Sequence, residues 1–289
     1  MKVLVTGAAG FMAAHLIKRL RTEGHETVGV DVQGECLHAN LTDAEAMRQV
    51  VRTTHPDACV HLGAISFVPD AARDRDLLWR VNVGGTENLL EALGLEAPKA
   101  RVLVISSAQV LAEPRSAYAE SKLAAEAAAW RAKEAGMDVM VARPANHTGP
   151  GQSPKFAIPS FVVQAIDIRS GGAARFKVGN LDAVRDFTDV RDMARAYVAV
   201  MDKGCSGGCY AIASGIRLSM RELLGRIAAI AGVGTEHEID RTLWRPADSP
   251  PTLDLAPMHA LGWRAEIPID ETIRDMIEYF RATPFTQRQ

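Results

Sequence analysis

The sequence predicts an α/β fold built on a doubly wound parallel sheet, and three observations carry this prediction. The chain opens on a short apolar strand that runs into a glycine-bearing turn and then a helix. Short aliphatic runs then alternate with helical patterns through the first half. Beyond Pro144, glycine and proline crowd the chain and the helical pattern becomes intermittent. Such alternation predicts parallel strands that bind ligands at their carboxyl ends, followed by a smaller α/β region.

The first element combines a buried strand at Val3–Val5, a turn with the pattern Gly7-x-x-Gly10 and a helix from about Phe11. Gly7 suits a tight turn, and Gly10 lets backbone N–H groups approach a pyrophosphate at the helix N-terminus. A second strand then ends at Asp31. This order and spacing favours dinucleotide binding over a plain glycine-rich turn.

The later elements follow in the same way. Further strands are expected at 26–30, 58–60, 102–105, 139–142 and 210–213, and helices at 44–51, 77–90, 117–135, 161–168, 189–200, 219–231 and 270–280. We expect an NAD-binding Rossmann domain over 1–148, completed by about 182–213. The expected substrate-binding region comprises 149–181 and 214–289.

Composition disfavours several classes of protein. The 289 residues are 47% hydrophobic, which is ample for a globular core, and the formal net charge of −2 gives no basic field for nucleic acid or an anionic membrane. The chain starts directly on a strand without a leader pattern and has no apolar run of membrane-spanning length, so we expect a cytoplasmic protein. The four cysteines lack C-x-x-C spacing, which favours reduced thiols and no metal site.

Tyr118 and Lys122 lie four residues apart in an alanine-rich helical segment and therefore share one face. An ammonium beside a phenol lowers the pKa of the phenol, so the tyrosine could exchange protons with an alcohol. Ser106 and Ser107 end the fourth strand, at the edge where such a sheet binds ligands. The alternative is an ordinary exposed helix turn, and the context favours a catalytic group.

Gly7-x-x-Gly10, Ser107 and Tyr118-x-x-x-Lys122 resemble the motifs of the extended short-chain dehydrogenase/reductases, which act on nucleotide sugars. Two longer stretches, 143–152 and 178–187, are similar to the GDP-mannose dehydratase and GDP-4-keto-6-deoxy-mannose reductase branch, which includes the GDP-6-deoxy-talose dehydrogenase type. The resemblance covers nearly the whole chain. It implies NAD as cofactor, a nucleotide-diphosphate sugar as substrate and a homodimer built on a four-helix contact.

The resemblance also implies roles for individual residues. Ser107, Tyr118 and Lys122 would be catalytic, with Tyr118 passing a proton to the sugar C4 oxygen and Lys122 gripping the nicotinamide ribose. The implied cofactor contacts are Gly7, Gly10, Phe11, Met12, Asp31, Asn40, Leu41, Leu62, Gly63, Ala64, Asn82, Ile105, Tyr118, Lys122 and Pro144. The implied substrate contacts are Ser66, Ser107, Gln109, Asn146, His147, Asn180, Arg185, Arg245 and Asp248.

Some of these assignments keep a structural alternative. Arg185 could instead form a surface ion pair with Asp182 or Asp186. His147 is better explained as a structural hydrogen-bonding residue than as a catalyst, and His61 as a packing residue.

The chain departs from the family pattern at several positions. Ala13 stands at the third glycine of the fingerprint, where a small side chain suffices. Asn40 stands where the family commonly has an aspartate. Only ten residues separate Ser107 from Tyr118, fewer than in the family, so we expect an abbreviated lid.

Gln109 bears on the choice among functions. Dehydratases of this branch place a glutamate at this position, and an amide cannot act as a general base, which argues against dehydration. Oxidation or reduction at C4 requires only the three catalytic residues and the nicotinamide, and so does a 4-epimerase, which stays open. A nucleotide-sensing protein on the same fold is the non-enzymatic alternative. The nucleotide base, the sugar, the stereochemistry and the direction also stay open.

Two further expectations concern cofactor choice and assembly. A carboxylate at Asp31 can accept hydrogen bonds from the adenosine ribose and would repel a 2′-phosphate, and residues 31–47 hold no Lys or Arg, so we expect NAD rather than NADP. The alternative is a solvated Asp31 with a distant arginine over the site. Six alanines between 119 and 129 allow close approach by another helix, unless they pack on their own sheet.

Overall fold

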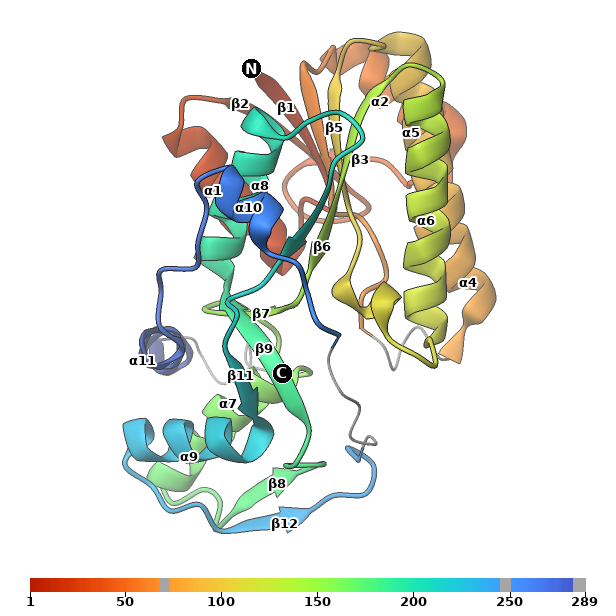
Figure 1. Ribbon diagram of the computed structural model, residues 1–289. Helices are drawn as coiled ribbons and strands as arrows, with labels where there is room; N and C mark the ends of the chain where they lie inside the picture. Colours follow the sequence, from red (N-terminus) through yellow and green to blue (C-terminus); the bar gives the residue numbers. More distant parts are fainter. Residues whose placement is uncertain (68–72, 245–250, 283–289) are drawn as a thin grey trace. The chain divides into compact units, whose positions relative to one another are not determined.

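The computed structural model describes residues 1–67, 73–244 and 251–282, and the chain divides into two compact units (Figure 1). The first unit comprises 1–145, 194–212 and 253–264, and the second comprises 146–193, 213–252 and 265–289. The division differs from the expected boundaries in several segments. Residues 146–148, 182–193 and 213 belong to the second unit. Residues 253–264 belong to the first, where Met258 and Trp263 are buried.

The described part of the first unit contains a seven-stranded sheet in the order β10-β6-β5-β4-β1-β2-β3, and every neighbouring pair is parallel. Its strands are β1 (Lys2–Thr6), β2 (Glu26–Asp31), β3 (Leu37–His38), β4 (Ala58–His61), β5 (Arg101–Ile105), β6 (Asp138–Pro144) and β10 (Cys209–Ile212). The strand order reverses between β1 and β4. The carboxyl ends of these two strands therefore form the crevice in which a doubly wound sheet binds its ligand.

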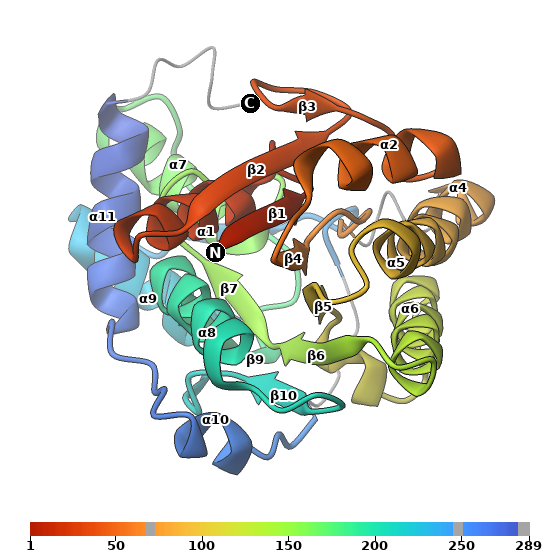
Figure 2. The same ribbon diagram turned by 90° about the horizontal axis from the view of Figure 1, so that it is seen from above.

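Helices cover both faces of this sheet, as the view from above shows (Figure 2). On one face lie α2 (Ala44–Thr54), α5 (Gly85–Glu96) and α6 (Ala117–Glu134). On the other lie α1 (Phe11–Thr22) and the part of α8 (Val190–Lys203) that starts at Ala194. The short α10 (Ala256–Ala260) contacts β10.

The region from residue 75 to 96 differs from the single expected helix. It is built of α4 (Arg75–Trp79), a π-helical stretch at Arg80–Gly84 and then α5. The extra residue per turn of a π-helix changes the direction of the side chains that follow it. Asn82 lies in this stretch and is almost completely buried.

Apolar side chains between the sheet and the α2, α5 and α6 layer form the core of the first unit. Leu4, Cys59 and Val102 contribute from the sheet, and Met47 and Leu89 from the helices. Strands β1, β4 and β5 are buried on both faces, which explains why their sequences are continuous apolar runs instead of alternating ones.

In the second unit the described residues form two small sheets with three main helices. The sheets are β11-β9-β7 and β12-β8, with β7 (Asn146–Thr148), β8 (Phe176–Val178), β9 (Val184–Asp189), β11 (Arg217–Ser219) and β12 (His237–Ile239). The helices are α7 (Ala157–Arg169), α9 (Met220–Ala231) and α11 (Ile269–Ala282), and their apolar faces share one core with Phe176 and Val178 of β8.

Candidate active site

Helix α6 carries the predicted tyrosine and lysine on its buried face. The hydroxyl of Ser116 caps the helix by accepting the N–H of Ala119 at 3.2 Å, so Tyr118 and Lys122 occupy its first two turns. Both side chains are buried against the sheet. The Nζ atom of Lys122 donates to the carbonyl oxygen of Ile105 at 2.7 Å, which ties the lysine to the end of β5.

Ser107 follows β5 by two residues and begins a short 3₁₀ helix, Ala108–Leu111. Its Oγ accepts the N–H of Gln109 at 3.2 Å. The hydroxyl of Ser107 and the phenol of Tyr118 also share a hydrogen bond. The structure therefore brings Ser107, Tyr118 and Lys122 together at the carboxyl end of β5, as the spacing predicted.

The protonation of the phenol differs from the expectation. Burial raises the pKa of Tyr118 to about 12, and the hydrogen bond with Ser107 acts in the opposite direction without overcoming it. The ammonium of Lys122 is directed to the carbonyl oxygen of Ile105. Burial in turn lowers the pKa of Lys122 to about 8, while the carboxylate of Glu126 raises it.

The turn between β1 and α1 requires glycine at two positions. Gly7 has φ of +68°, and a Cβ atom there would lie 2.8 Å from the backbone of Gly63 after β4. A Cβ atom on Gly10 would lie 3.0 Å from the carbonyl oxygen of Gly7. Among the described residues, no side chain caps the N-terminus of α1 and its first turn holds no acid. These features fit the pyrophosphate of a dinucleotide.

Asp31 lies where an adenosine ribose is expected, at the end of β2. One carboxylate oxygen accepts the N–H of Ala9 at 3.1 Å, and the other accepts the N–H of Val32 at 2.6 Å. The carboxylate therefore fixes the glycine turn from the neighbouring strand.

Other predicted cofactor residues pack around the same strand ends. A Cβ atom added to Gly63 or to Gly85 would collide with the side chain of Leu41, so glycine suits both positions. Asn40 uses its side-chain oxygen to accept the N–H of Thr42 at 3.0 Å. Phe11 and Met12 start α1, Leu62 and Ala64 flank Gly63, and Pro144 ends β6.

The side chain of Asn82 is fully used inside the first unit. Its Oδ1 accepts the N–H of Ile65 at 2.8 Å, and its Nδ2 donates to the carbonyl oxygen of Ile65 at 3.1 Å and to the Oγ of Ser121 at 3.0 Å. Asn82 therefore fixes the segment after β4 to helix α6, one residue before Lys122. Its predicted contact with the cofactor stays a prediction.

His61 ends β4 in a closed chain of hydrogen bonds. The hydroxyl of Thr86 donates to the carbonyl oxygen of Asn82 at 2.7 Å and so accepts from Nε2 of His61 at 2.9 Å. Nδ1 then accepts from the hydroxyl of Thr6 at 2.7 Å. Burial, assisted by the charge of Lys122, lowers the pKa of His61 to about 3. The residue is a neutral packing group, in line with its expected role.

The predicted substrate residues of the second unit lie on the β11-β9-β7 sheet or beside it. Asn146 of β7 is the register partner of Phe187 in β9, and Arg185 precedes Phe187 by two residues, so Asn146 and Arg185 face the same side. His147 follows in β7, and Asn180 accepts the N–H of Asp182.

The carboxylates considered as partners of Arg185 have other contacts. Asp182 pairs with Arg221 at 3.0 Å, and Asp186 accepts three hydrogen bonds from Ser214 and Gly215. Ser66 and Gln109 belong to the first unit. Arg245 and Asp248 lie outside the described residues.

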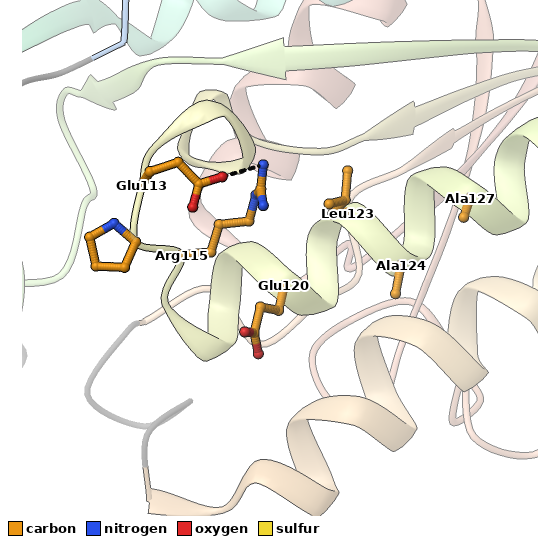
Figure 3. Close-up of a pocket in the computed structure, with 7 residues that line it drawn as sticks. Glu113, Arg115, Glu120, Leu123, Ala124 and Ala127 are labelled. Carbon is orange, nitrogen blue, oxygen red and sulfur yellow. Dashed lines mark ion pairs between the residues drawn. The ribbon is translucent and has the colours of Figure 1, made fainter.

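A groove on the first unit lies along the surface of α6 (Figure 3), and none of its lining residues belongs to the candidate catalytic set. Glu120, Leu123, Ala124 and Ala127 line it at helical spacing, together with the segment Glu113–Arg115. Glu113 and Arg115 form an ion pair of 2.7 Å. The groove therefore belongs to the helix surface and not to the candidate active site.

Within the described ranges, one group of metal-type donors occurs, formed by Glu23, His25 and Asp202. It lies at the amino end of β2, opposite the strand ends that carry the candidate site, and Glu23 already pairs with Arg19. The four cysteines, all within the described ranges, are free thiols. No helix in the described part of the chain is both long and apolar enough to cross a bilayer.

Sequence reasoning missed the ion pair of Glu126 and Arg143 beside Lys122. The guanidinium of Arg143 in β6 donates Nε to Oε1 of Glu126 at 2.9 Å and Nη2 to Oε2 at 2.5 Å. A signal was present, because Glu126 follows Lys122 by four residues and so lies on the same helix face.

Comparison with known proteins gives the family. The model of the NAD dependent epimerase/dehydratase family matches residues 3–213. A curated relative, the GDP-6-deoxy-D-mannose reductase of Pseudomonas aeruginosa, is 33% identical over 296 residues, covering 96% of each chain. The GDP-6-deoxy-D-talose 4-dehydrogenase of Aggregatibacter actinomycetemcomitans is 30% identical over 246 residues, covering 80% of each. The chain belongs to the NAD dependent epimerase/dehydratase family.

Solved structures agree with this assignment. The structure of RMD from Pseudomonas aeruginosa complexed with NADPH has a TM-score of 0.87 at 33% identity and covers 97% of this chain and 99% of that one. The UDP-glucose 4-epimerase of Thermus thermophilus in complex with NAD has a TM-score of 0.84 at 26% identity, covering 98% of this chain and 100% of that one. The doubly wound parallel sheet predicted from the sequence is confirmed, and the cofactor is a nicotinamide dinucleotide.

Proposed function

We propose that this chain is an oxidoreductase that transfers hydride between NAD(H) and C4 of a nucleotide-diphosphate sugar, as a GDP-4-keto-6-deoxy-mannose-type reductase or dehydrogenase. The observation that carries the proposal is the convergence of Ser107, Tyr118 and Lys122 at the carboxyl end of β5. The family membership and the two GDP-6-deoxyhexose oxidoreductases among its relatives support the substrate class.

The glycine turn, Asp31 and Lys122 would hold the dinucleotide, at its pyrophosphate, adenosine ribose and nicotinamide ribose respectively. When bound, the nicotinamide supplies the hydride for a carbonyl or accepts it from an alcohol. Tyr118 provides the proton to the sugar C4 oxygen as the carbonyl becomes an alcohol, while the hydroxyl of Ser107 holds the same oxygen. The phenolate left at Tyr118 is stabilised by the ammonium of Lys122, one helical turn away.

Burial raises the pKa of Tyr118 to about 12. The phenol therefore keeps its proton at neutral pH and is present as the acid that reduction of a carbonyl needs.

Asn146, His147, Asn180 and Arg185 of the second unit would contact the nucleotide diphosphate or the sugar, together with Ser66 and Gln109 of the first. The guanidinium of Arg185 suits a diphosphate because its planar fork donates two hydrogen bonds at fixed geometry. Arg245 and Asp248 complete the predicted set. A cytoplasmic location stays a prediction from the sequence.

A homodimer through α6 and the helical segment near Leu77–Leu93 belongs to the same proposal. The alanines of α6 give it less support than the sequence suggested. Ala119, Ala125, Ala128 and Ala129 are buried within their own subunit, so most of the alanines pack internally. Leu77 and Trp79 of α4 and Leu123 of α6 remain exposed on neighbouring helices. These side chains, with the groove of Figure 3, support a self-contact of limited size.

The testing experiment incubates purified protein with GDP-4-keto-6-deoxy-mannose and NADH. We expect loss of NADH absorbance matched by formation of one GDP-6-deoxyhexose alcohol. Interconversion of nucleotide-sugar 4-epimers with retained cofactor and no net change of NADH would establish the epimerase instead. Binding of NADH and of nucleotide sugar without turnover would establish the sensing protein.

A further inference from the structure

Glu126 is a carboxylate in the interior of the first unit, only 1% exposed. Both of its oxygens accept hydrogen bonds from the guanidinium of Arg143, in a bidentate arrangement. Burying an ion pair removes two charges from water, and a well-packed apolar pair of similar volume would serve packing at least as well. Because the pair lies beside Lys122, its carboxylate can influence the charge of that lysine, which an apolar pair could not do.

Three buried side chains follow one another along the inner face of α6 at intervals of four residues: Tyr118, Lys122 and Glu126. Lys122 lies between the other two. Its Nζ donates to the carbonyl oxygen of Ile105, a contact that a neutral amine could also make. The hydrogen bond with Ile105 therefore places the nitrogen without fixing its charge.

The charged and titratable groups around Lys122 come from several elements. His61 of β4 is neutral because burial lowers its pKa to about 3. Arg143 of β6 faces the carboxylate of Glu126, and Cys209 of β10 lies beside that pair. The π-helical stretch contributes the uncharged Asn82 next to Ser121, and the arginines of this region, Arg75 and Arg80, are exposed. Glu126 is the anion that acts on Lys122.

We propose that Glu126, held by Arg143, is a positioning residue that keeps Lys122 in the ammonium form on which proton transfer at Tyr118 depends. The proposal rests on the proposed function of Lys122. Burial lowers the pKa of Lys122 to about 8 and Glu126 opposes this effect. Removing the carboxylate therefore moves loss of the ammonium to lower pH, into the neutral range. The two hydrogen bonds from Arg143 in turn hold the carboxylate in place.

The first test measures kcat/KM against pH for the unmodified protein and for Glu126→Gln. We expect the alkaline limb to move to lower pH, so that the ratio of activity at pH 8.5 to activity at pH 6.5 falls at least twofold, roughly the effect of lowering the pKa by about half a unit. Glu120→Gln is the matched control, because Glu120 lies on the same helix but its side chain is 41% exposed and pairs with Arg75 at 2.8 Å. A uniform loss of activity at all pH values in Glu126→Gln would overturn the proposal.

A double variant separates positioning from stability. Glu126→Gln leaves the charge of Arg143 unpaired and is expected to lower Tm, whereas Glu126→Gln with Arg143→Gln removes both charges and should recover part of it. In the double variant the alkaline limb should lie between those of the unmodified protein and Glu126→Gln, because loss of the Arg143 cation removes its repulsion of the Lys122 ammonium. An alkaline limb that stays unmoved in Glu126→Gln while Tm falls would show that the pair acts only on stability.

Cofactor binding gives a readout that does not need turnover. NADH binding is followed by fluorescence titration from pH 6.5 to 9. The pH at which NADH affinity is lost should be lower for Glu126→Gln than for the unmodified protein. Lys122→Met should show no such loss of affinity at alkaline pH. If no nucleotide sugar is turned over but this difference is found, the proposed function fails and the role of Glu126 stands. Identical pH dependence in the unmodified protein and Glu126→Gln would contradict that role, whatever the substrate.

Discussion

The carboxylate of Asp31 accepts the backbone N–H of Ala9 at 3.1 Å and thereby joins the end of β2 to the glycine turn. A negative charge is thus fixed beside the turn where the adenosine half of a dinucleotide is expected. A 2′-phosphate brought to this position would meet like charge in a partly desolvated setting.

We therefore predict that kcat/KM favours NAD(H) over NADP(H) by tenfold or more. A tenfold preference corresponds to about 1.4 kcal/mol. Asp31→Ala should narrow the gap mainly by weakening NAD(H). Asp31→Asn removes the charge and keeps one acceptor oxygen for Ala9, although it gives up the hydrogen bond from Val32. The related Pseudomonas aeruginosa structure contains NADPH, so both cofactors should be measured side by side on this chain. Equal or better use of NADP(H) by the unmodified protein would show that this interpretation of Asp31 is wrong.

Asn82 should be a stability determinant of the candidate site. Asn82→Ala removes a side chain that is 1% exposed and leaves Ile65 and Ser121 without their partners. We expect a loss of roughly 2–4 kcal/mol in the free energy of unfolding, measured by urea titration. Asn88→Ala in α5 is the matched control, because that amide has one bond, to the carbonyl oxygen of Leu41. Equal losses in the two variants would contradict the role of Asn82.

His61 predicts a dependence of stability on pH. The folded state holds the pKa of His61 near 3, below its unfolded value, so the unfolded state binds the extra proton as pH falls through 6.5. Stability from this group is complete above pH 6.5 and is lost on acidification, by about 2 kcal/mol at pH 5. Denaturant titrations at pH 7 and pH 5 measure this loss in the free energy of unfolding. His61→Gln should show a smaller difference, whereas the exposed His38→Gln should behave like the unmodified protein.

The proposed homodimer depends on the exposed side chains of α4 and α6. We expect light scattering to give twice the chain mass of 31.2 kDa at micromolar concentration. Leu123→Glu introduces a charge at a side chain that is 38% exposed on α6 and should shift the mass toward one chain. Ile239→Glu, at an exposed position of β12, should leave the mass unchanged. A single-chain mass for the unmodified protein would exclude the dimer.

Most helices and most strands of the first unit could be predicted from the sequence because their signals are local. The strands of the second unit, β7, β8, β9, β11 and β12, were missed because these short segments carry no clear alternation of apolar and polar residues. Buried parallel strands such as β1 and β5 are continuous apolar runs, and the caps at Asp43 and Ser219 precede helices α2 and α9. Strand β3 was missed because its two residues are exposed and carry no apolar pattern. The π-helical stretch was missed because a single wide turn leaves the apolar content of the segment unchanged.

The candidate site could also be predicted from the sequence only in part. Tyr118 and Lys122 could be predicted because they share one helix, and Ser107 because it ends a strand. The contacts that surround them join residues far apart in the chain, such as Thr6 with His61 and Glu126 with Arg143. Burial also reversed the expected protonation of Tyr118, since the position of the Lys122 ammonium on Ile105 cannot be inferred from spacing.

Turnover by Tyr118→Phe tests the central claim most directly. The substitution removes the phenol hydroxyl and leaves the ring packed, with Tyr279→Phe in α11 as an exposed control. With GDP-4-keto-6-deoxy-mannose and NADH, we predict that kcat falls by about 100-fold or more while the Kd for NADH stays within about twofold. Turnover close to that of the unmodified protein would contradict the assignment of Tyr118 as the proton donor.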